Sequence, residues 1–419
     1  MPNHAATLMK RQPLSDRLRA VPRNVWIVTV TSFLTDISSE MIINLLPLYL
    51  ANVLGVKTSV IGLIEGIAES TASLLKVFSG WLSDRLSQRK WLTVAGYSLS
   101  TVAKPFLYFA GTWGVVLGVR FADRVGKGIR TAPRDALIAD SVDESQRGLS
   151  FGLHRAGDTA GAMLGLLVAL GIVWGLQAGG VSLARSTFQT VVLVSIIPAV
   201  LGVLVLAFGA QEKPPQGTAQ APRLSLQGFD RPFKLLLVAA MVFTLGNSSD
   251  AFLILRAQER GLSVLGVMSM LVTFNFVYTV ISSPAGALSD RIGRRRIITA
   301  GWLLYGLIYL GFALVSAAWQ VWALYAVYGV YYGLAEGTVR ALVADLVTPE
   351  QRGTAYGIFN AAIGLTAFPA SFIAGLLWQG IGPWSGFGPQ APFIFGAGMA
   401  TIAVVMLTAW LPKKSVAPS

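Results

Sequence analysis

The chain has 419 residues, of which 54% are hydrophobic and only 13% are charged, against about 25% charged in a typical soluble domain. A single soluble core does not bury this much apolar side chain, so much of it must face lipid, and the net charge of +13 then indicates membrane topology rather than nucleic-acid binding. The lack of cysteine and the presence of only two histidines exclude disulfides, thiolate sites, cysteine nucleophiles and histidine-rich metal sites.

Twelve hydrophobic runs follow one another along the chain, and each is long enough to cross a bilayer as a helix. Helices satisfy their own backbone hydrogen bonds in lipid, and the runs are too long for barrel strands, so an all-α polytopic membrane protein is predicted. The expected spans are 25–54, 59–83, 91–111, 113–140, 149–174, 187–209, 233–257, 263–288, 297–317, 319–345, 354–379 and 391–411.

Basic residues gather on one side of these spans, which predicts an inner (plasma) membrane protein with both termini in the cytoplasm. The polar segment 211–230 contains proline and glycine and separates spans six and seven. We therefore expect two six-helix bundles, 24–210 and 231–412, joined by this cytoplasmic linker and flanked by cytoplasmic tails, 1–23 and 413–419.

The two predicted bundles repeat each other. GWLSDRLSQRK at 80–90 matches GALSDRIGRRR at 286–296, and ADSVDESQRGLSFG at 139–152 matches ADLVTPEQRGTAYG at 344–357. The two matches have almost the same spacing and occupy the same places in their halves, which indicates an internal duplication.

The repeated block resembles the loop between helices two and three of the major facilitator superfamily, approximately Gly-x-x-x-Asp-Arg-x-Gly-Arg-Arg. The second copy fits fully, whereas Ser87 replaces the second glycine in the first copy. Arg124 with Gly128 resembles the family's helix four, and Gly157, Gly161 and Gly165 resemble its glycine-rich helix five, with Ala162 where antiporters carry proline. The resemblance implies the fold of this family, two pseudo-symmetric six-helix bundles, and secondary transport by alternating access.

The resemblance also implies a cytoplasmic gate, in which the aspartate at the end of helix two and nearby arginines latch the two halves together. Asp140 and Asp345, at the ends of helices four and ten, are the expected partners of the arginines. The simpler alternative is that the arginines only set topology. The predicted gate residues are Gly80, Asp84, Arg85, Arg89, Asp140, Gly286, Asp290, Arg291, Arg294 and Asp345.

Span four carries the most informative charge pattern. Five cations in it recur every three or four residues, so they share one helix face within an arc of about 120°. Because a charge near the bilayer centre costs at least about 2.5–3.5 kcal/mol, the face must meet carboxylates, water or an anionic substrate. Pro133 is expected to kink this span or split the stripe. The five cations are Arg120, Arg124, Lys127, Arg130 and Arg134.

Several membrane carboxylates are candidate partners or proton carriers. Asp36 and Glu40 share one face of span one, as Glu65 and Glu69 do in span two, and either pair could serve structural ion pairs or function. We favour Asp36 or Glu40 as the proton carrier and Arg120, Arg124 and Lys127 as the groups that attract an anion. The other candidates for substrate or proton coupling are Arg130, His154, Arg155, Asp158, Asn247, Asp250, Glu336 and Arg340.

The sequence thus predicts a proton-coupled secondary transporter of a small organic anion, without cofactor or metal, acting as a monomer in the lipid bilayer. Proton-coupled efflux of multiple drugs is the alternative, with the span-four cations used in internal pairing. An intramembrane enzyme lacks a visible catalytic set, and a non-transporting sensor lacks an obvious signalling extension. The partners implied are a small-molecule substrate and protons, and no nucleic acid.

Overall fold

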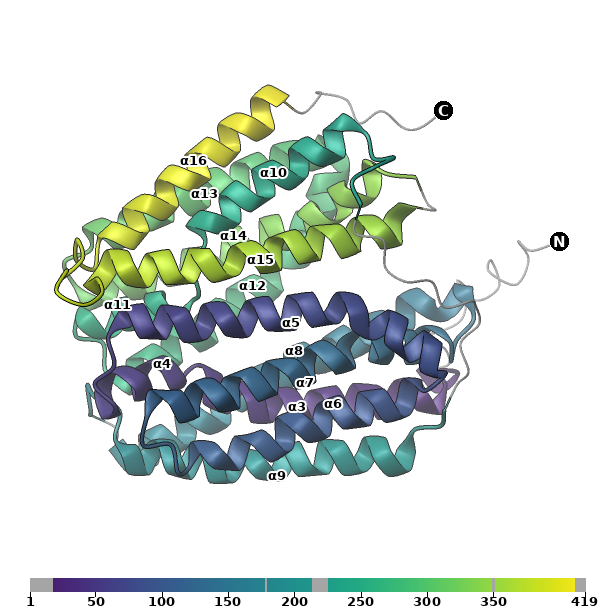
Figure 1. Ribbon diagram of the computed structural model, residues 1–419, viewed down its shortest axis with the longest axis horizontal. Helices are drawn as coiled ribbons and strands as arrows, with labels where there is room; N and C mark the ends of the chain where they lie inside the picture. Colours follow the sequence, from purple (N-terminus) through teal and green to yellow (C-terminus); the bar gives the residue numbers. More distant parts are fainter. Residues whose placement is uncertain (1–17, 178, 213–224, 349–350, 411–419) are drawn as a thin grey trace.

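The structure, a computed structural model, describes residues 18–177, 179–212, 225–348 and 351–410 (Figure 1). Every regular element in this part is a helix, which confirms the predicted twelve-helix, all-α fold. The first six spans are α3 (Arg23–Ile43) with α4 (Leu46–Leu48) and the π-helix η1 (Tyr49–Val53), α5 (Thr58–Leu86), α6 (Arg89–Ala103) with the 3₁₀ helix η2 (Lys104–Leu107), α7 (Trp113–Ala139), α8 (Glu144–Gln177) and α9 (Arg185–Gly209). The last six are α10 (Arg231–Gly246) with α11 (Ala251–Glu259), α12 (Val264–Ile292), α13 (Arg294–Leu314), α14 (Ala318–Asp345), α15 (Arg352–Gln379) and α16 (Ala391–Trp410).

Eight helical segments of the described part are long and apolar enough to cross a membrane. Helix α7 is not among them, and it carries seven charged residues along its length. A helix of that composition is tolerated in a bilayer only when its charges face other protein groups or water. The chain is therefore a multi-pass membrane protein whose most charged helix lies inside a bundle.

The helices pack as two groups that follow the chain order. In the N-terminal half, α3 packs against α8 and α9, and α6 packs against α7. In the C-terminal half, α12 packs against α14, and α16 packs against α10 and α13. Figure 1 shows α3, α5, α6, α7 and α9 below and α10, α13, α15 and α16 above. The predicted boundaries stay a prediction, since 1–17, 213–224 and 411–419 lie outside the described residues.

Two ends of the molecule must be distinguished. We call the end where α3 begins and α7 and α9 finish the terminal face; there Asn24 bonds to Ser141 and Gln211. Helix α16 also ends there, since Arg295 at the start of α13 donates to the carbonyl oxygen of Thr408. This face is on the right in Figure 1, and the opposite face, with α4 and α11, is on the left.

Spans one and seven are interrupted, whereas the sequence predicted continuous helices. Helix α3 ends at Ile43 before α4 begins, and α10 ends at Gly246 before α11 begins at Ala251. Pro47 in the first turn of α4 cannot donate a backbone hydrogen bond, and the polar run 247–250 offers side chains that compete with the backbone. By contrast, α7 continues through Pro133, so the expected split of its cation stripe is wrong.

Glycines allow close approach along two helix seams. On α8, a Cβ atom at Gly161 or Gly165 would lie 2.4 Å from the carbonyl oxygens of Phe33 and Ile37 on α3. Between the halves, a Cβ atom at Gly62 on α5 would lie 2.2 Å from the carbonyl oxygen of Ser371 on α15. Small residues at such positions let membrane helices pack backbone to backbone. The second seam holds the two halves together toward the opposite face.

Substitution of Gly62 tests this seam. Leucine at position 62 would overlap the α15 backbone, so Gly62→Leu is expected to separate the halves at the opposite face. The chain has no cysteine, so Thr58→Cys and Gln379→Cys can be added directly, at positions joined by a 2.7 Å hydrogen bond. Disulfide cross-linking of this pair should fall several-fold in Gly62→Leu. Gly175→Leu, at a glycine facing open space, is the control and should not change it.

Candidate functional site

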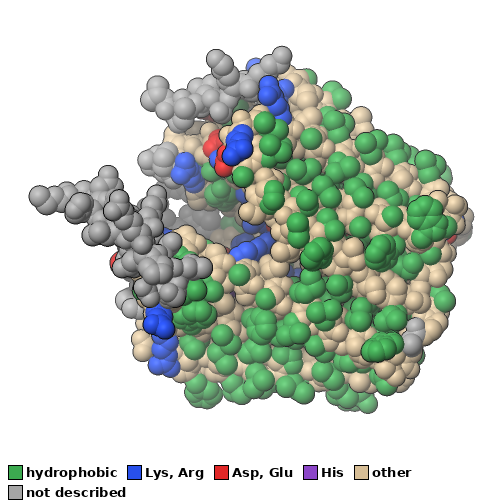
Figure 2. Space-filling model, turned by 180° about the vertical axis from the view of Figure 1, so that it is seen from behind, with side chains coloured by type: hydrophobic (Ala, Val, Ile, Leu, Met, Phe, Trp, Pro, Cys, Tyr) green, Lys and Arg blue, Asp and Glu red, His purple; other side chains and the backbone are tan. Residues whose placement is uncertain are grey.

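A cavity of about 640 Å³ lies between the two halves. It is lined by α3, α4 and α5 from one half and by α10, α11, α13, α14 and α15 from the other. Seen from behind in Figure 2, the molecule is hollowed between its halves at the terminal face, and Lys and Arg side chains are visible inside. We call this space the central cavity. Its size suits a drug-sized organic molecule.

The charged side chains around the central cavity are mostly acidic. Five of the residues predicted from the sequence line it: Glu40, Asn247, Asp250, Glu336 and Arg340. Glu65 and Glu69 join them, so five carboxylates and one guanidinium face the same space. Arginines pair with three of these carboxylates, Glu65, Glu69 and Glu336. The unbalanced negative charge of the lining is therefore that of Glu40 and Asp250, and it would attract a cation.

Aromatic side chains of the C-terminal half form an apolar wall of the central cavity. Phe243 stacks on Trp302 with 4.5 Å between ring centroids, and Tyr331 and Tyr332 lie beside them. Aromatic faces carry negative potential and attract cations, especially where water is excluded. The aromatic wall therefore favours a positively charged solute, as the carboxylates do.

Glu40 and Asp250 stand out among the cavity carboxylates because neither is within ion-pair distance of a described cation. Glu40 accepts a 2.9 Å hydrogen bond from Asn44, and Asp250 accepts a 3.2 Å bond from Tyr328. Both donors are neutral. Glu40 lies in the last turn of α3, just before span one is interrupted, and Asp250 lies in the interruption of span seven. They occupy corresponding places in the LTDISSE and TLGNSSD segments of the two halves. The two halves thus present equivalent unbalanced charges to one cavity.

The span-four cations are largely occupied within the N-terminal half. Arg120 forms a 2.6 Å ion pair with Glu65, both with side chains about 5% exposed, and Arg124 pairs with Glu69 at 3.0 Å. Arg130 donates to Ser100 and lies over the ring of Tyr97. Arg134 pairs with Asp135. Lys127 is exposed, and its ammonium has no hydrogen-bond or ion-pair partner in the described part of the chain.

A second, smaller cavity of about 130 Å³ lies within the N-terminal half, and we call it the N-terminal chamber. Of the predicted residues it is lined by Asp36, Glu40, Arg120, Arg124, Lys127 and Arg130. Lys104, Asp123 and Glu69 also line it. Glu40 and Glu69 therefore border both the chamber and the central cavity.

The predicted residues of α8 lie elsewhere. His154 is buried and its Nε2 is 3.6 Å from a carboxylate oxygen of Asp158. Arg155 reaches the C-terminal half, where it lies 3.7 Å from Glu336 and 3.5 Å from the hydroxyl of Tyr278. None of the three α8 residues lines the central cavity or the chamber, so their role in substrate or proton coupling stays a prediction.

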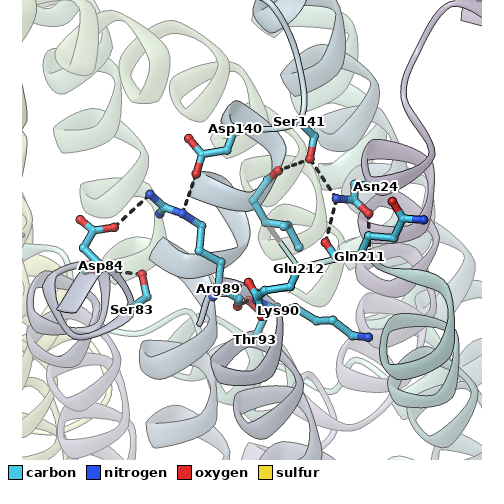
Figure 3. Close-up of polar contacts among 12 residues, drawn as sticks. Asn24, Ser83, Asp84, Arg89, Lys90, Thr93, Asp140, Ser141, Gln211 and Glu212 are labelled. Atoms are coloured by element: carbon cyan, nitrogen blue, oxygen red, sulfur yellow. Dashed lines mark hydrogen bonds and ion pairs between the residues drawn. The ribbon is translucent and has the colours of Figure 1, made fainter. Parts of the chain in front are cut away.

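The predicted gate residues form separate ion-pair networks, one in each half. Arg89 contacts Asp84 at 3.0 Å and Asp140 at 2.5 Å, as Figure 3 shows. Arg294 contacts Asp345 at 2.9 Å and Asp290 at 3.6 Å. No ion pair among the described residues joins one network to the other. The two networks are therefore separate in this structure, and their role as a latch between the halves stays a prediction.

The other gate residues make weaker contacts. Arg85 lies over the ring of Trp81, and Gly80 allows α5 to approach Ala132 of α7. Arg291 is exposed, and a Cβ atom at Gly286 would meet no atom within 4 Å. These positions do not contribute to the two networks.

The N-terminal gate network is tied to the chain that enters the linker. The carboxylate of Glu212 accepts hydrogen bonds of 2.8 and 3.0 Å from the backbone N–H groups of Arg89 and Lys90, at the start of α6 (Figure 3). Asn24 also pairs with the backbone of Gln211. A carboxylate at a helix start satisfies unpaired N–H groups and complements the helix dipole. Glu212 therefore fixes the helix turn that carries Arg89.

Comparison with known proteins decides the family. The sequence matches the description of the Major Facilitator Superfamily over residues 28–272 and 235–419. The chain belongs to the major facilitator superfamily. It is 35% identical, over 93% of its length and 95% of the relative's, to an uncharacterized MFS-type transporter of Methanocaldococcus jannaschii.

Two further matches show how broad this superfamily is. The chain is 26% identical to the multidrug resistance protein MdtG of Proteus mirabilis, covering 84% of this chain and 87% of that one. Its fold matches a POT family transporter solved with 5-aminolevulinic acid, with a TM-score of 0.77, 14% identity, and coverage of 94% and 96%. The facilitator fold is thus established, and membership indicates a transporter.

One contact of this facilitator that the sequence did not reveal joins the two halves at the opposite face. The side-chain amides of Asn52 and Gln258 bond to each other reciprocally, at 2.9 and 2.7 Å, and so join the two halves. The oxygen of Asn52 also accepts from the backbone N–H of Leu183, and Gln258 donates to the carbonyl of Val181. We call the Asn52–Gln258 pair the amide clasp. Asparagine and glutamine are uncharged and belong to no motif here, so the sequence did not indicate that this pair would form.

Removal of the amide clasp is expected to open the opposite face of this facilitator. Asn52→Ala eliminates two hydrogen bonds between the halves, at about 0.5–1.5 kcal/mol each. The population open at the opposite face should therefore rise roughly 5- to 150-fold. Spin labels at Thr112→Cys and Ser316→Cys, exposed in the two halves, would report a longer distance by double electron–electron resonance.

A matched control for the clasp is Gln189→Ala, which removes an amide bonded to Tyr108 within the same half. It should leave the distance distribution unchanged. If Asn52→Ala also leaves it unchanged, the amide clasp does not hold the face closed.

Proposed function

We propose that this facilitator exports organic cations by proton-coupled alternating access, in the inner (plasma) membrane, with its terminal face in the cytoplasm. The observation that carries the proposal is the pair of carboxylates, Glu40 and Asp250, which face one cavity without a balancing cation. A positively charged solute would supply the missing charge. The aromatic wall would hold its apolar part.

The preference for a cation reverses the substrate favoured from the sequence. The sequence favoured an organic anion because of the span-four stripe, but Arg120 and Arg124 are engaged by Glu65 and Glu69. The alternative of multidrug-type efflux therefore suits the cavity better. The 26% identity to a multidrug resistance protein supports the same choice.

The state of the molecule supports alternating access. The amide clasp and the α5–α15 seam close the opposite face, while the central cavity opens toward the terminal face and the gate networks are separate. In this state a cytoplasmic solute would reach Glu40 and Asp250. Rocking of the halves about the cavity would then expose the same site on the other side.

Competition between a proton and the solute for the same carboxylates explains the coupling and the direction. A carboxylate that holds a proton is neutral and no longer attracts a cation, so the two ligands bind alternately. Alternate binding produces antiport. With a proton gradient directed into the cell, antiport moves the organic cation out.

Transport into proteoliposomes tests this proposal. The purified protein is reconstituted into vesicles with an acidic lumen, and uptake of the aromatic cation ethidium is followed by fluorescence, with fluorescein as an anion of similar size. We expect pH-driven uptake of ethidium several-fold above protein-free vesicles, and none of fluorescein. Uptake of fluorescein but not of ethidium would show that the substrate is an organic anion. Uptake of ethidium that does not depend on the pH gradient would refute proton coupling.

A further inference from the structure

The central cavity carries charges of opposite sign at two levels. Its unbalanced negative charges, Glu40 and Asp250, lie far from the terminal face, one in the last turn of α3 and the other beyond the end of α10. Arg340 lines the same cavity from the last two turns of α14, close to the terminal face. Lys and Arg side chains are visible inside the hollow at that face in Figure 2. A solute that enters there meets positive charge first and negative charge further in.

Lys76 adds a cation near the level of Arg340. It lies on the same face of α5 as Glu69 and Ser73, which line the central cavity, because the three positions are four and three residues apart. The helix rise places it about 10 Å nearer to the terminal face than Glu69. Its side chain is partly buried, and its ammonium has no hydrogen-bond or ion-pair partner among the described residues. A lysine that only set topology would lie beyond the helix end, whereas Lys76 lies almost three turns before it.

The arginines near Lys76 share too few carboxylates. Arg155 and Arg340 lie 3.7 and 3.3 Å from one carboxylate, that of Glu336, so this group of three keeps a positive charge. Both arginines act on the ammonium of Lys76, which adds a second positive charge. The other charged neighbours of that ammonium pair with each other and cancel: Arg134 and Asp135. We call the three cations in excess of their partners the basic tier: Lys76, Arg155 and Arg340.

The two levels together are complementary to a molecule that carries both signs of charge. Asp158, which also acts on Arg155, reduces the excess of the basic tier without cancelling it. A solute with a positive group alone would satisfy the inner carboxylates and leave the basic tier without a counter-charge. A solute with an acidic group on its outer end would satisfy both levels at once.

We propose that the preferred substrates are zwitterions, which place a cationic group between Glu40 and Asp250 and an acidic group between Lys76 and Arg340. Arg155 would keep Glu336 occupied, so that Arg340 stays available to the acidic group. The inference rests on the proposed function, because it adds a second subsite to the same cavity. A cation without an acidic group would still bind, but more weakly.

Three dyes that share one skeleton test this subsite. Rhodamine 123 is a cationic ester, rhodamine 110 is the corresponding free acid and therefore carries both charges, and fluorescein is an anion. Binding to the purified protein is measured by fluorescence anisotropy. We expect rhodamine 110 to bind about tenfold more tightly than rhodamine 123, the difference typical of one hydrogen bond between charged groups, and fluorescein to bind weakly.

Variants of the basic tier show where the acidic group binds. Lys76→Gln and Arg340→Gln should each weaken rhodamine 110 about tenfold without weakening rhodamine 123, whose retained binding also shows that the variants are folded. Lys57→Gln removes an exposed lysine just before α5 and is the matched control; it should leave both dyes unchanged. Loss of both dyes to the same extent in the two tier variants, or loss of neither, would overturn the subsite for the acidic group.

A carboxylate variant separates this inference from the proposed function. Asp250→Asn should weaken both rhodamines, because each has a cationic group, whereas Asp143→Asn, at an exposed loop residue, should weaken neither. If Asp250→Asn changes neither rhodamine while the tier variants weaken rhodamine 110 and fluorescein alike, the basic tier binds acidic groups and the proposed cation site is refuted. If only the tier variants have no effect, the cation site stands and the zwitterion is refuted.

Discussion

Asp250→Asn is expected to reduce organic cation affinity at least 30-fold while leaving the protein folded. The carboxylate is the unbalanced charge of the C-terminal half, and removal of one partner of a buried charge pair costs about 2–5 kcal/mol of binding. Asparagine has nearly the same shape and can still accept the hydrogen bond from Tyr328. Ethidium binding to the purified variant, measured by fluorescence anisotropy, checks the prediction.

The pseudo-equivalent substitution provides an internal comparison. Glu40→Gln should weaken ethidium binding to a similar extent, because Glu40 occupies the corresponding place in the N-terminal half. Asp143→Asn should bind ethidium like the wild type. Unchanged affinity in both Asp250→Asn and Glu40→Gln would mean that these carboxylates do not contact the solute.

Arg120→Met is expected to destabilise the protein strongly. The substitution leaves Glu65 as a buried carboxylate without its ion-pair partner, and breaking a buried pair in this way costs about 3–5 kcal/mol. Thermal unfolding in detergent, followed by tryptophan fluorescence, should show a clearly lower midpoint. The effect has a structural origin, so it should occur with or without a solute.

A second substitution distinguishes ion pairing from anion binding. Arg120→Met/Glu65→Gln removes both charges, and it should recover most of the lost stability together with ethidium transport. If Arg120→Met is stable and instead loses binding of an anionic solute, the cation would belong to the substrate site. The organic anion would then be the correct substrate class.

The sequence predicted the fold because the features that determine it are local or repeated. Hydrophobic runs of bilayer length and the duplicated blocks beginning at Gly80 and Gly286 each indicate structure without knowledge of distant contacts. The same comparison of halves places Glu40 opposite Asp250, and both line the central cavity. Equivalence between repeats was thus the strongest guide to the site.

The partners of the span-four cations were beyond prediction. Arg120 lies 55 residues from Glu65, and which cation meets which carboxylate depends on how α7 packs against α5. The sequence therefore left ion pairing and anion binding as alternatives. Lys104 gave no signal of its own, because one lysine before a proline near the end of a span is also typical of a membrane boundary. Its burial results from tertiary packing.

The hydrogen bonds of Glu212 have a practical consequence for the separation of the two bundles. The last residues before the linker are held by Asn24, Arg89 and Lys90, all from the N-terminal bundle, so the end of α9 does not rely on the rest of the chain for its position. A backbone cut after Glu212 would therefore leave this attachment intact. The molecule is suited to reassembly from two separately expressed fragments, each of which could carry its own isotope label.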